Sequence, residues 1–152
     1  MISQEDIMNM PEKELRAKLM YFAYRYYDYT IDDTSTLKVR KVYEGEDKQT
    51  LQGWGNYSIF VADLDNLKPL NDTKGHAAGD LAISIGGRAI LESMAVNKGL
   101  IGIDEFGELI VREGENLEGI IDIVRHKAMA YRIGGDEMLV AKIHDTDCIK
   151  SI

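Results

Sequence analysis

Residues 57–63 read YSIFVAD, a run of β-branched and aromatic residues that ends at an acidic position. Such a run predicts a buried strand, because side chains of this kind pack well on the faces of a sheet. Two further apolar segments, residues 128–133 and 138–143, flank the sequence Gly134-Gly135-Asp136-Glu137. Glycines between two apolar runs predict a β-hairpin with its turn at the glycines. The sequence therefore predicts a sheet that contains at least these three strands.

The N-terminal residues 4–29 predict a helix. Ser3 is placed to cap this helix, and Asp6 supplies the acidic partner of a capping box. A start at Pro11 is the alternative, since proline is tolerated in a first helical turn. One helical stripe holds Leu15, Leu19, Phe22 and Tyr26, with Tyr29 close by. The stripe indicates a core or dimer-packing helix, and an aromatic platform for stacking bases is the alternative.

The middle of the chain predicts further helices and a second hairpin. A break at residues 32–35 precedes a mixed-charge helix that continues to about residue 51. A helix over residues 79–95 is expected to turn four apolar positions inward, namely Leu81, Ile85, Ala89 and Met94. Residues 99–114 predict a hairpin around an acidic turn, and residues 116–128 predict a short helix. This order of strands and helices indicates an α/β (α+β) layer fold.

The composition of the chain, which is acidic, argues against several classes of function. The 152 residues include 18 Lys and Arg against 26 Asp and Glu, which gives a formal charge of −8. This balance argues against binding a nucleic-acid polymer, because counterion release needs clustered Lys and Arg. No apolar run approaches the ~18 residues of a membrane span, and the single cysteine, Cys148, excludes an internal disulfide framework. We expect one cytoplasmic domain over residues 1–152 that makes no membrane contact.

Carboxylates next to strand ends and glycines occur at two places. Asp63 lies at the exit of the first predicted strand, and Asp136 lies in the glycine turn. Adjacent strands would bring the two side chains together on rigid backbone. Two carboxylates and a backbone carbonyl form a hard-oxygen site suited to Mg²⁺, which normally shares its shell with substrate phosphates. A triphosphate is the natural partner of such a site, and acids in solvated turns are the alternative.

Polar residues between these two places offer a second set of contacts. Asn71 carries an amide donor and acceptor, and Asp80 can accept two N–H donors, which matches the edge of a guanine base. The alternative is that Asp80 caps the helix it opens and Asn71 closes a turn. Lys68 is placed to meet a phosphate as a point charge, although it also suits an exposed surface.

These residues resemble a known family. Residues 63–80, DLDNLKPLNDTKGHAAGD, are similar to the D-x-D-x-F-K-x-x-N-D-x-x-G-H-x-x-G-D signature of GGDEF domains, the diguanylate cyclases. Residues 134–138, GGDEM, resemble the GGDEF motif itself. The family's D-x-L-T-G-L-x-N-R opening is matched only at Asp33, Leu37 and Arg40. The resemblance covers roughly residues 33–95 and 129–143.

The resemblance implies a palm-like nucleotide-cyclase fold with a central antiparallel or mixed sheet and packed helices. Residues 1–32 would add an N-terminal helix, and residues 99–128 would form an insertion that carries the extra hairpin. The implied activity, a signalling reaction, is condensation of two GTP molecules into cyclic di-GMP with release of pyrophosphate. It implies an antiparallel homodimer, with one GTP in each subunit and Mg²⁺ or Mn²⁺ as the cofactor.

Position by position, the resemblance assigns roles to residues of this chain. The implied metal ligands are Asp63, Leu64 through its carbonyl, Asp136 and Glu137. The implied catalytic residues are Asp136 and Glu137, with Glu137 at the reacting hydroxyl or at a second metal. The implied substrate-binding residues are Asn71 and Asp80 for guanine, Lys68 for phosphate, and Leu67.

The chain also departs from the family pattern. Met138 and Leu67 replace phenylalanines, and both remain apolar, so packing should survive. The family's inhibitory R-x-x-D site falls at residues 125–128 with Ala128 in place of the aspartate, so feedback through that site is not expected. The Lys and Arg that later elements of the family give to the phosphates have no counterpart. An active cyclase, a domain that binds GTP without turnover and a structural dimerisation unit are therefore the three hypotheses.

Overall fold

The computed structural model describes residues 3–144, without the side chains of residues 21–28 and Trp54. Cys148 and the side chains of Phe22 and Tyr26 lie outside the described residues. The helices are α1 (Gln4–Met8), α2 (Glu12–Thr30), α3 (Arg40–Val42), the π-helical turn η1 (Tyr43–Asp47), α4 (Lys48–Trp54), α5 (Leu67–Lys74), α6 (His76–Asn97) and α7 (Leu117–Lys127). The strands are β1 (Lys38–Val39), β2 (Tyr57–Asp63), β3 (Gly102–Ile103), β4 (Leu109–Ile110), β5 (Met129–Arg132) and β6 (Glu137–Ile143).

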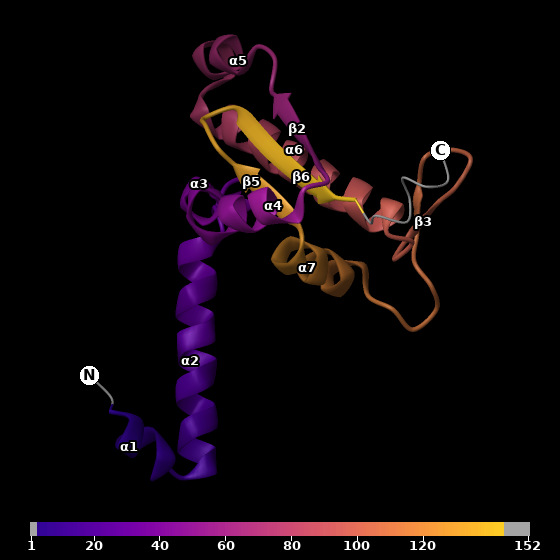
Figure 1. Cartoon of the computed structure of the whole chain (residues 1–152). Coiled ribbons are helices and arrows are strands. Elements are labelled where there is room, and N and C mark those ends of the chain that lie inside the picture. The colour runs from indigo at the N-terminus through magenta and orange to yellow at the C-terminus, as the bar shows by residue number, and fades with distance from the viewer. Residues whose placement is uncertain (1–2, 145–152) are drawn as a thin grey trace.

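A mixed sheet forms the centre of the fold, which confirms the α/β class (Figure 1). Within the described residues its strand order is β1-β5-β6-β2, with β1 parallel to β5 and the other neighbours antiparallel. The β5–β6 pair is the hairpin predicted around Gly134 and Gly135. The second predicted hairpin is also present, as the short antiparallel pair β3–β4.

The strands have two apolar faces, because successive side chains point to opposite sides of a sheet. Met138 and Val140 of β6 pack into a core on the side of α6 and α7, which we call the α6-side core. Leu139 and Ala141 of the same strand pack with Tyr131 and Leu51 into a second core on the side of η1 and α4. Helices therefore cover both faces of the sheet.

Strand β2 has the predicted bounds but is not buried. It pairs with β6 along its whole length, from Tyr57 opposite Ile143 to Asp63 opposite Glu137, and it forms an outer edge of the sheet. The side chains of Phe60 and Val61 are 59% and 61% exposed. The prediction of burial was wrong because an apolar sequence specifies a strand, whereas its neighbours decide whether the strand is covered.

Helix α6 packs on the sheet through a face other than the predicted one. Its buried residues are Gly79, Ile83, Gly87, Leu91 and Ala95. Leu81, Ile85 and Ala89, which were expected inside, are exposed, and Met94 is partly buried. A Cβ atom at Gly87 would lie 2.0 Å from the carbonyl oxygen of Ser35. Close approach of the Ser35 backbone at Gly87 therefore helps to set the inner face.

The N-terminal helix predicted over residues 4–29 is divided in two. Ser3 caps α1 in a capping box with Asp6, as expected. The helix stops at Met8, and α2 begins after Pro11, because proline disfavours helical backbone in the residue before it. Helix α2 extends away from the sheet and carries α1 at its far end (Figure 1). Both predicted starts are thus present, as two helices.

The segment after α2 differs from the single helix predicted up to residue 51. Residues 38–39 form strand β1, and helical structure begins only at Arg40. The helical segment is kinked at Gly45, whose ψ of −120° is not helical. Asp32 Oδ2 accepts a hydrogen bond from Ser35 N at 2.7 Å, so the predicted break is a side-chain-capped turn.

Candidate functional site

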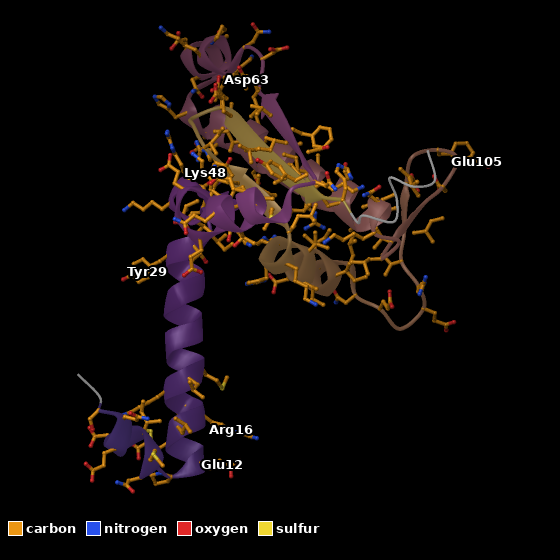
Figure 2. All side chains as sticks on the ribbon, in the orientation of Figure 1. Glu12, Arg16, Tyr29, Lys48, Asp63 and Glu105 are labelled. Atoms are coloured by element: carbon orange, nitrogen blue, oxygen red, sulfur yellow. The ribbon has the colours of Figure 1, made fainter. Side chains whose placement is uncertain are left out.

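Three carboxylates gather where β2 meets the β5–β6 hairpin. One ligand oxygen from each of Asp63, Asp136 and Glu137 lies within 4.8 Å of the others. We call these three residues the acidic cluster. Asp63 and Glu137 are direct partners across the β2–β6 pair. The backbone N–H of Leu64 donates to the carbonyl of Asp136 at 3.0 Å, which ties the strand end to the hairpin. Figure 2 places Asp63 at this end of the sheet.

The electrostatics of the cluster show like charges held close together. The pKa of Asp63 is raised, chiefly by a hydrogen bond shared with Asp136, then by desolvation and by the negative charges of Asp136, Glu137 and Asp65. Among the side chains that the structure describes, no ion pair involves a member of the cluster. The donor set is three carboxylates, two at strand ends and Asp136 in the turn of the hairpin. It fits a hard divalent cation, which would relieve this repulsion.

A second polar group lies between α5 and α6, which pack together. The Oδ1 atom of Asn71 is buried and has no hydrogen-bond partner among the described residues. It lies so close to Gly79 that a Cβ atom there would come within 1.7 Å of it. Buried polar atoms in folded proteins are nearly always paired, so an unpaired acceptor at this place suits a ligand that brings an N–H donor.

Asp80 does not cap the helix in which it lies. Helix α6 begins at His76, four positions earlier than Asp80, and Gly75 occupies its N-cap position. The carboxylate of Asp80 is exposed and forms no hydrogen bond or ion pair with the side chains that the structure describes. The structural alternative for Asp80, helix capping, was therefore wrong, and its carboxylate is accessible to a ligand.

Leu67 and Lys68 open α5 directly after the loop that leaves β2. Leu67 is partly buried against the α6-side core, and Lys68 is exposed. Leu64 also packs against this core, so its side chain points away from the solvent-facing acids. No contact between described residues links Lys68 to the acidic cluster. Its role in binding a phosphate stays a prediction.

Sequence reasoning missed Arg132, which holds the hairpin turn in place. Its guanidinium donates to the carbonyls of Gly134 and Gly135 at 3.2 and 2.8 Å. It also forms an ion pair with Asp32 at 3.2 Å. Burial acts to raise the pKa of Asp32, but hydrogen bonds from Ser35 and the charge of Arg132 outweigh it and leave this pKa lowered. A signal was available for the contacts with the turn only, since Arg132 lies two positions before Gly134.

No protein-family model matches the chain. Over 88 residues it is 41% identical to "Probable diguanylate cyclase DgcJ" of Escherichia coli K12, covering 53% of this chain and 18% of that protein. Over 86 residues it is 33% identical to "Diguanylate cyclase DgcS" of Shewanella oneidensis, covering 57% of this chain and 19% of that protein. The chain carries a partial GGDEF domain.

A solved structure shares the fold of this GGDEF domain. It is that of Vibrio cholerae LapD, described as S helix-GGDEF-EAL bound to c-di-GMP. The match has a TM-score of 0.54 at 18% identity and covers 90% of this chain and 27% of that one. The chain thus spans well under a third of each of these similar proteins. Among the residues described for this GGDEF domain, no helix has both the length and the apolar character needed to cross a bilayer.

Proposed function

We propose that this GGDEF domain binds GTP together with Mg²⁺ or Mn²⁺ and, as a homodimer, condenses two GTP molecules into cyclic di-GMP. The acidic cluster is the observation that carries the proposal, because three converging carboxylates without a basic partner favour a divalent cation. The similarity to diguanylate cyclases supports the choice of GTP. A cytoplasmic location and a single domain over residues 1–152, with residues 99–128 as an insertion, belong to the same proposal.

In this reaction the 3′-hydroxyl of one GTP attacks the α-phosphorus of the other, and pyrophosphate leaves. Asp63, Asp136 and Glu137 would hold the cation, with the carbonyl of Leu64 as a further ligand. When bound, the cation supplies charge neutralisation at the triphosphate. Glu137 would also orient the attacking hydroxyl and accept its proton. A similar attack in the opposite direction closes the ring and releases the second pyrophosphate.

Recognition of the base would fall to the polar group between α5 and α6. Asn71 Oδ1 is a buried acceptor without a partner, and Asp80 is an accessible carboxylate. A guanine edge presents N–H donors that both could accept, whereas adenine offers fewer donors to a carboxylate. Lys68, in the first turn of α5, would approach the phosphates, with Leu67 beside it. These placements predict a preference for GTP over ATP.

A second candidate function is GTP binding without turnover. It is favoured by the scarcity of positive charge at the site, since no Lys or Arg whose side chain is described pairs with the acidic cluster. A triphosphate carries more negative charge than one cation neutralises. A domain with this shortage could hold the nucleotide as a regulatory module and leave the α-phosphate unreacted.

The test uses the full chain, with GTP and with Mg²⁺ or Mn²⁺ present. Product formation at high protein concentration, followed by chromatography, supports the cyclase. Calorimetric GTP binding that is lost in Asp63→Asn, with no product, supports the binding module. Absence of cation-dependent GTP binding in the wild-type chain contradicts both functions and leaves a structural role.

A further inference from the structure

The hairpin at residues 99–114, which we call the arm, ends in an exposed aromatic side chain among acids. Phe106 is 83% exposed at the tip, between Asp104, Glu105 and Glu108. Figure 2 shows Glu105 at the outer end of the arm, away from the sheet. Aromatic side chains, phenylalanine among them, are enriched at protein–protein interfaces, so Phe106 is a candidate anchor for a partner.

The tip is held in one conformation. Asp104 Oδ1 accepts from the backbone N–H groups of Phe106 and Glu108 at 2.9 and 2.8 Å. The N–H of Gly107 donates to the carbonyl of Asp104, and the φ of Gly107 is +82°, a value that favours glycine. Ile101 is buried in the α6-side core and anchors the base of the arm. A partner would therefore meet a rigid anchor, and little entropy would be lost on binding.

A pocket of about 560 Å³ lies where the sheet meets the ends of α6 and α7. Apolar side chains line much of it, including Phe60, Met94 and Val140. No residue of the arm is among its lining residues, so the arm of the same chain does not fill it. The pocket belongs to neither the acidic cluster nor the Asn71–Asp80 region.

Three exposed lysines line this pocket: Lys98, Lys127 and Lys142. None of them forms an ion pair with another described residue. Lys98 and Lys127 lie at the C-terminal ends of α6 and α7, where the helix dipole favours a cation, but Lys142 on β6 has no such reason. In a chain with a net charge of −8, three unpaired lysines around one apolar pocket favour an acidic, apolar occupant.

We propose that the arm of a second copy of this chain occupies the pocket, with Phe106 inside it and the acids of the tip facing the lysines. The apolar tip matches the apolar lining, and the charges are of opposite sign. Asn97 and Lys98 at the C-terminal end of α6 line the pocket, and the arm follows directly at residue 99. In the proposed dimer, a two-fold axis would bring the arm of each copy to the pocket of the other. Such an exchange is closed and makes two identical contacts.

The first experiment measures association of the full chain by sedimentation equilibrium. Phe106→Ser is expected to weaken dimerisation about tenfold or more, as loss of a central aromatic anchor does. Leu81→Ser, which removes another exposed apolar side chain outside the arm and pocket, is the matched control and should leave association unchanged. A wild-type chain that stays monomeric, or a Phe106→Ser variant that dimerises like wild type, overturns the proposal.

A charge exchange tests the pairing itself. Glu105→Lys and Lys142→Glu are each expected to weaken the dimer. Either change places two like charges at positions 105 and 142, and the two-fold axis repeats this repulsion in both contacts. An equimolar mixture of the two single variants should regain wild-type association, since each arm then meets a pocket of opposite charge. A mixture that associates no better than either variant alone overturns the proposal, and so does restoration when Phe106→Ser is added to both chains.

A covalent readout separates this dimer from any other contact between copies. In a Cys148→Ser background, one batch carries Glu105→Cys and another carries Lys142→Cys. Oxidation of the mixture is expected to give a disulfide-linked dimer between the two batches in excess of either batch alone. Cross-linking no greater than that of a mixture of Lys142→Cys with Arg16→Cys, a position on α2, would count against arm exchange. An apolar small molecule as the true occupant would also give this result.

Discussion

Arg132 and Asp32 form an ion pair that joins the turn after α2 to the hairpin of the acidic cluster. Nη1 of Arg132 lies 3.2 Å from Oδ2 of Asp32, and the same guanidinium holds two carbonyls of the glycine turn. The side chain of Arg132 therefore connects the turn after α2 to the glycine turn that carries Asp136. A substitution that breaks the contact at one end of this connection should therefore alter the structure at the other end.

Arg132→Gln is expected to lower the free energy of unfolding by about 2 kcal/mol, because it removes charge-assisted hydrogen bonds from partly buried acceptors. It should also weaken binding of Mn²⁺ several-fold, since the glycine turn loses its support. Chemical denaturation and a metal titration measure the two effects. Arg16→Gln, which breaks an ion pair that is 79% exposed, is the control and should change neither. Unchanged metal affinity in Arg132→Gln would show that the turn holds its shape unaided.

Asp63→Asn is expected to raise the melting temperature of the metal-free protein at neutral pH. The pKa of Asp63 is raised in the folded state, so its carboxyl favours folding when protonated and opposes it as pH rises through the folded-state pKa. The variant and the wild type should therefore melt alike below about pH 4 and diverge toward pH 7. With saturating Mg²⁺ the order should reverse, because only the wild type gains from the cation. Equal melting temperatures at all pH values would contradict the charge repulsion.

Gly79→Ala is expected to reduce GTP affinity by roughly tenfold with little loss of stability. The added methyl group would meet Asn71 Oδ1 at 1.7 Å, and this flexible side chain can rotate away. Its rotation removes the acceptor proposed to read the base. Calorimetry with GTP measures the change in affinity, and a melting curve measures the change in stability. Gly53→Ala, where the added atom meets nothing within 4 Å, is the matched control and should bind GTP normally.

Gly87→Ala lies on the same face of α6 but should behave in the opposite way. Here the methyl group would meet the backbone carbonyl of Ser35 at 2.0 Å, and that carbonyl cannot rotate aside. We expect a loss of about 1–3 kcal/mol of stability, measured by urea denaturation. Gly79→Ala provides the comparison. Equal stabilities of the two variants would mean that the turn at residues 32–35 moves freely relative to α6.

The strands around the acidic cluster were predictable because their signals are local. The run at residues 57–63 and the glycines at 134 and 135 specify a strand and a hairpin within a few positions, and pairing them brings Asp63 toward Asp136. The resemblance of residues 63–80 to a known motif supplied the proposed roles of Asn71, Asp80 and Lys68. Those roles are still predictions, whereas the strands are observed.

The features that escaped prediction depend on distant partners. The ion pair of Arg132 with Asp32 joins residues 100 positions apart, so no local pattern reveals that contact. The inner face of α6 carries two glycines with close neighbours, the Asn71 side chain at Gly79 and the Ser35 backbone at Gly87. Helical periodicity instead counts large apolar residues such as Leu81 and Ile85. The break in the N-terminal helix was visible at Pro11, but the strand at residues 38–39 forms only because β5 lies beside it.

The outer edge of β2 has a practical consequence for handling this protein. Along that edge, backbone amides and carbonyls from Tyr57 to Asp63 find no strand partner among residues 3–144, and Lys and Pro, which often discourage stacking of strands, are absent from it. Concentrated preparations should accordingly be prone to grow by strand addition and to precipitate on storage. A lysine introduced at Ile59 would act as a gatekeeper and prolong shelf life without touching the metal ligands.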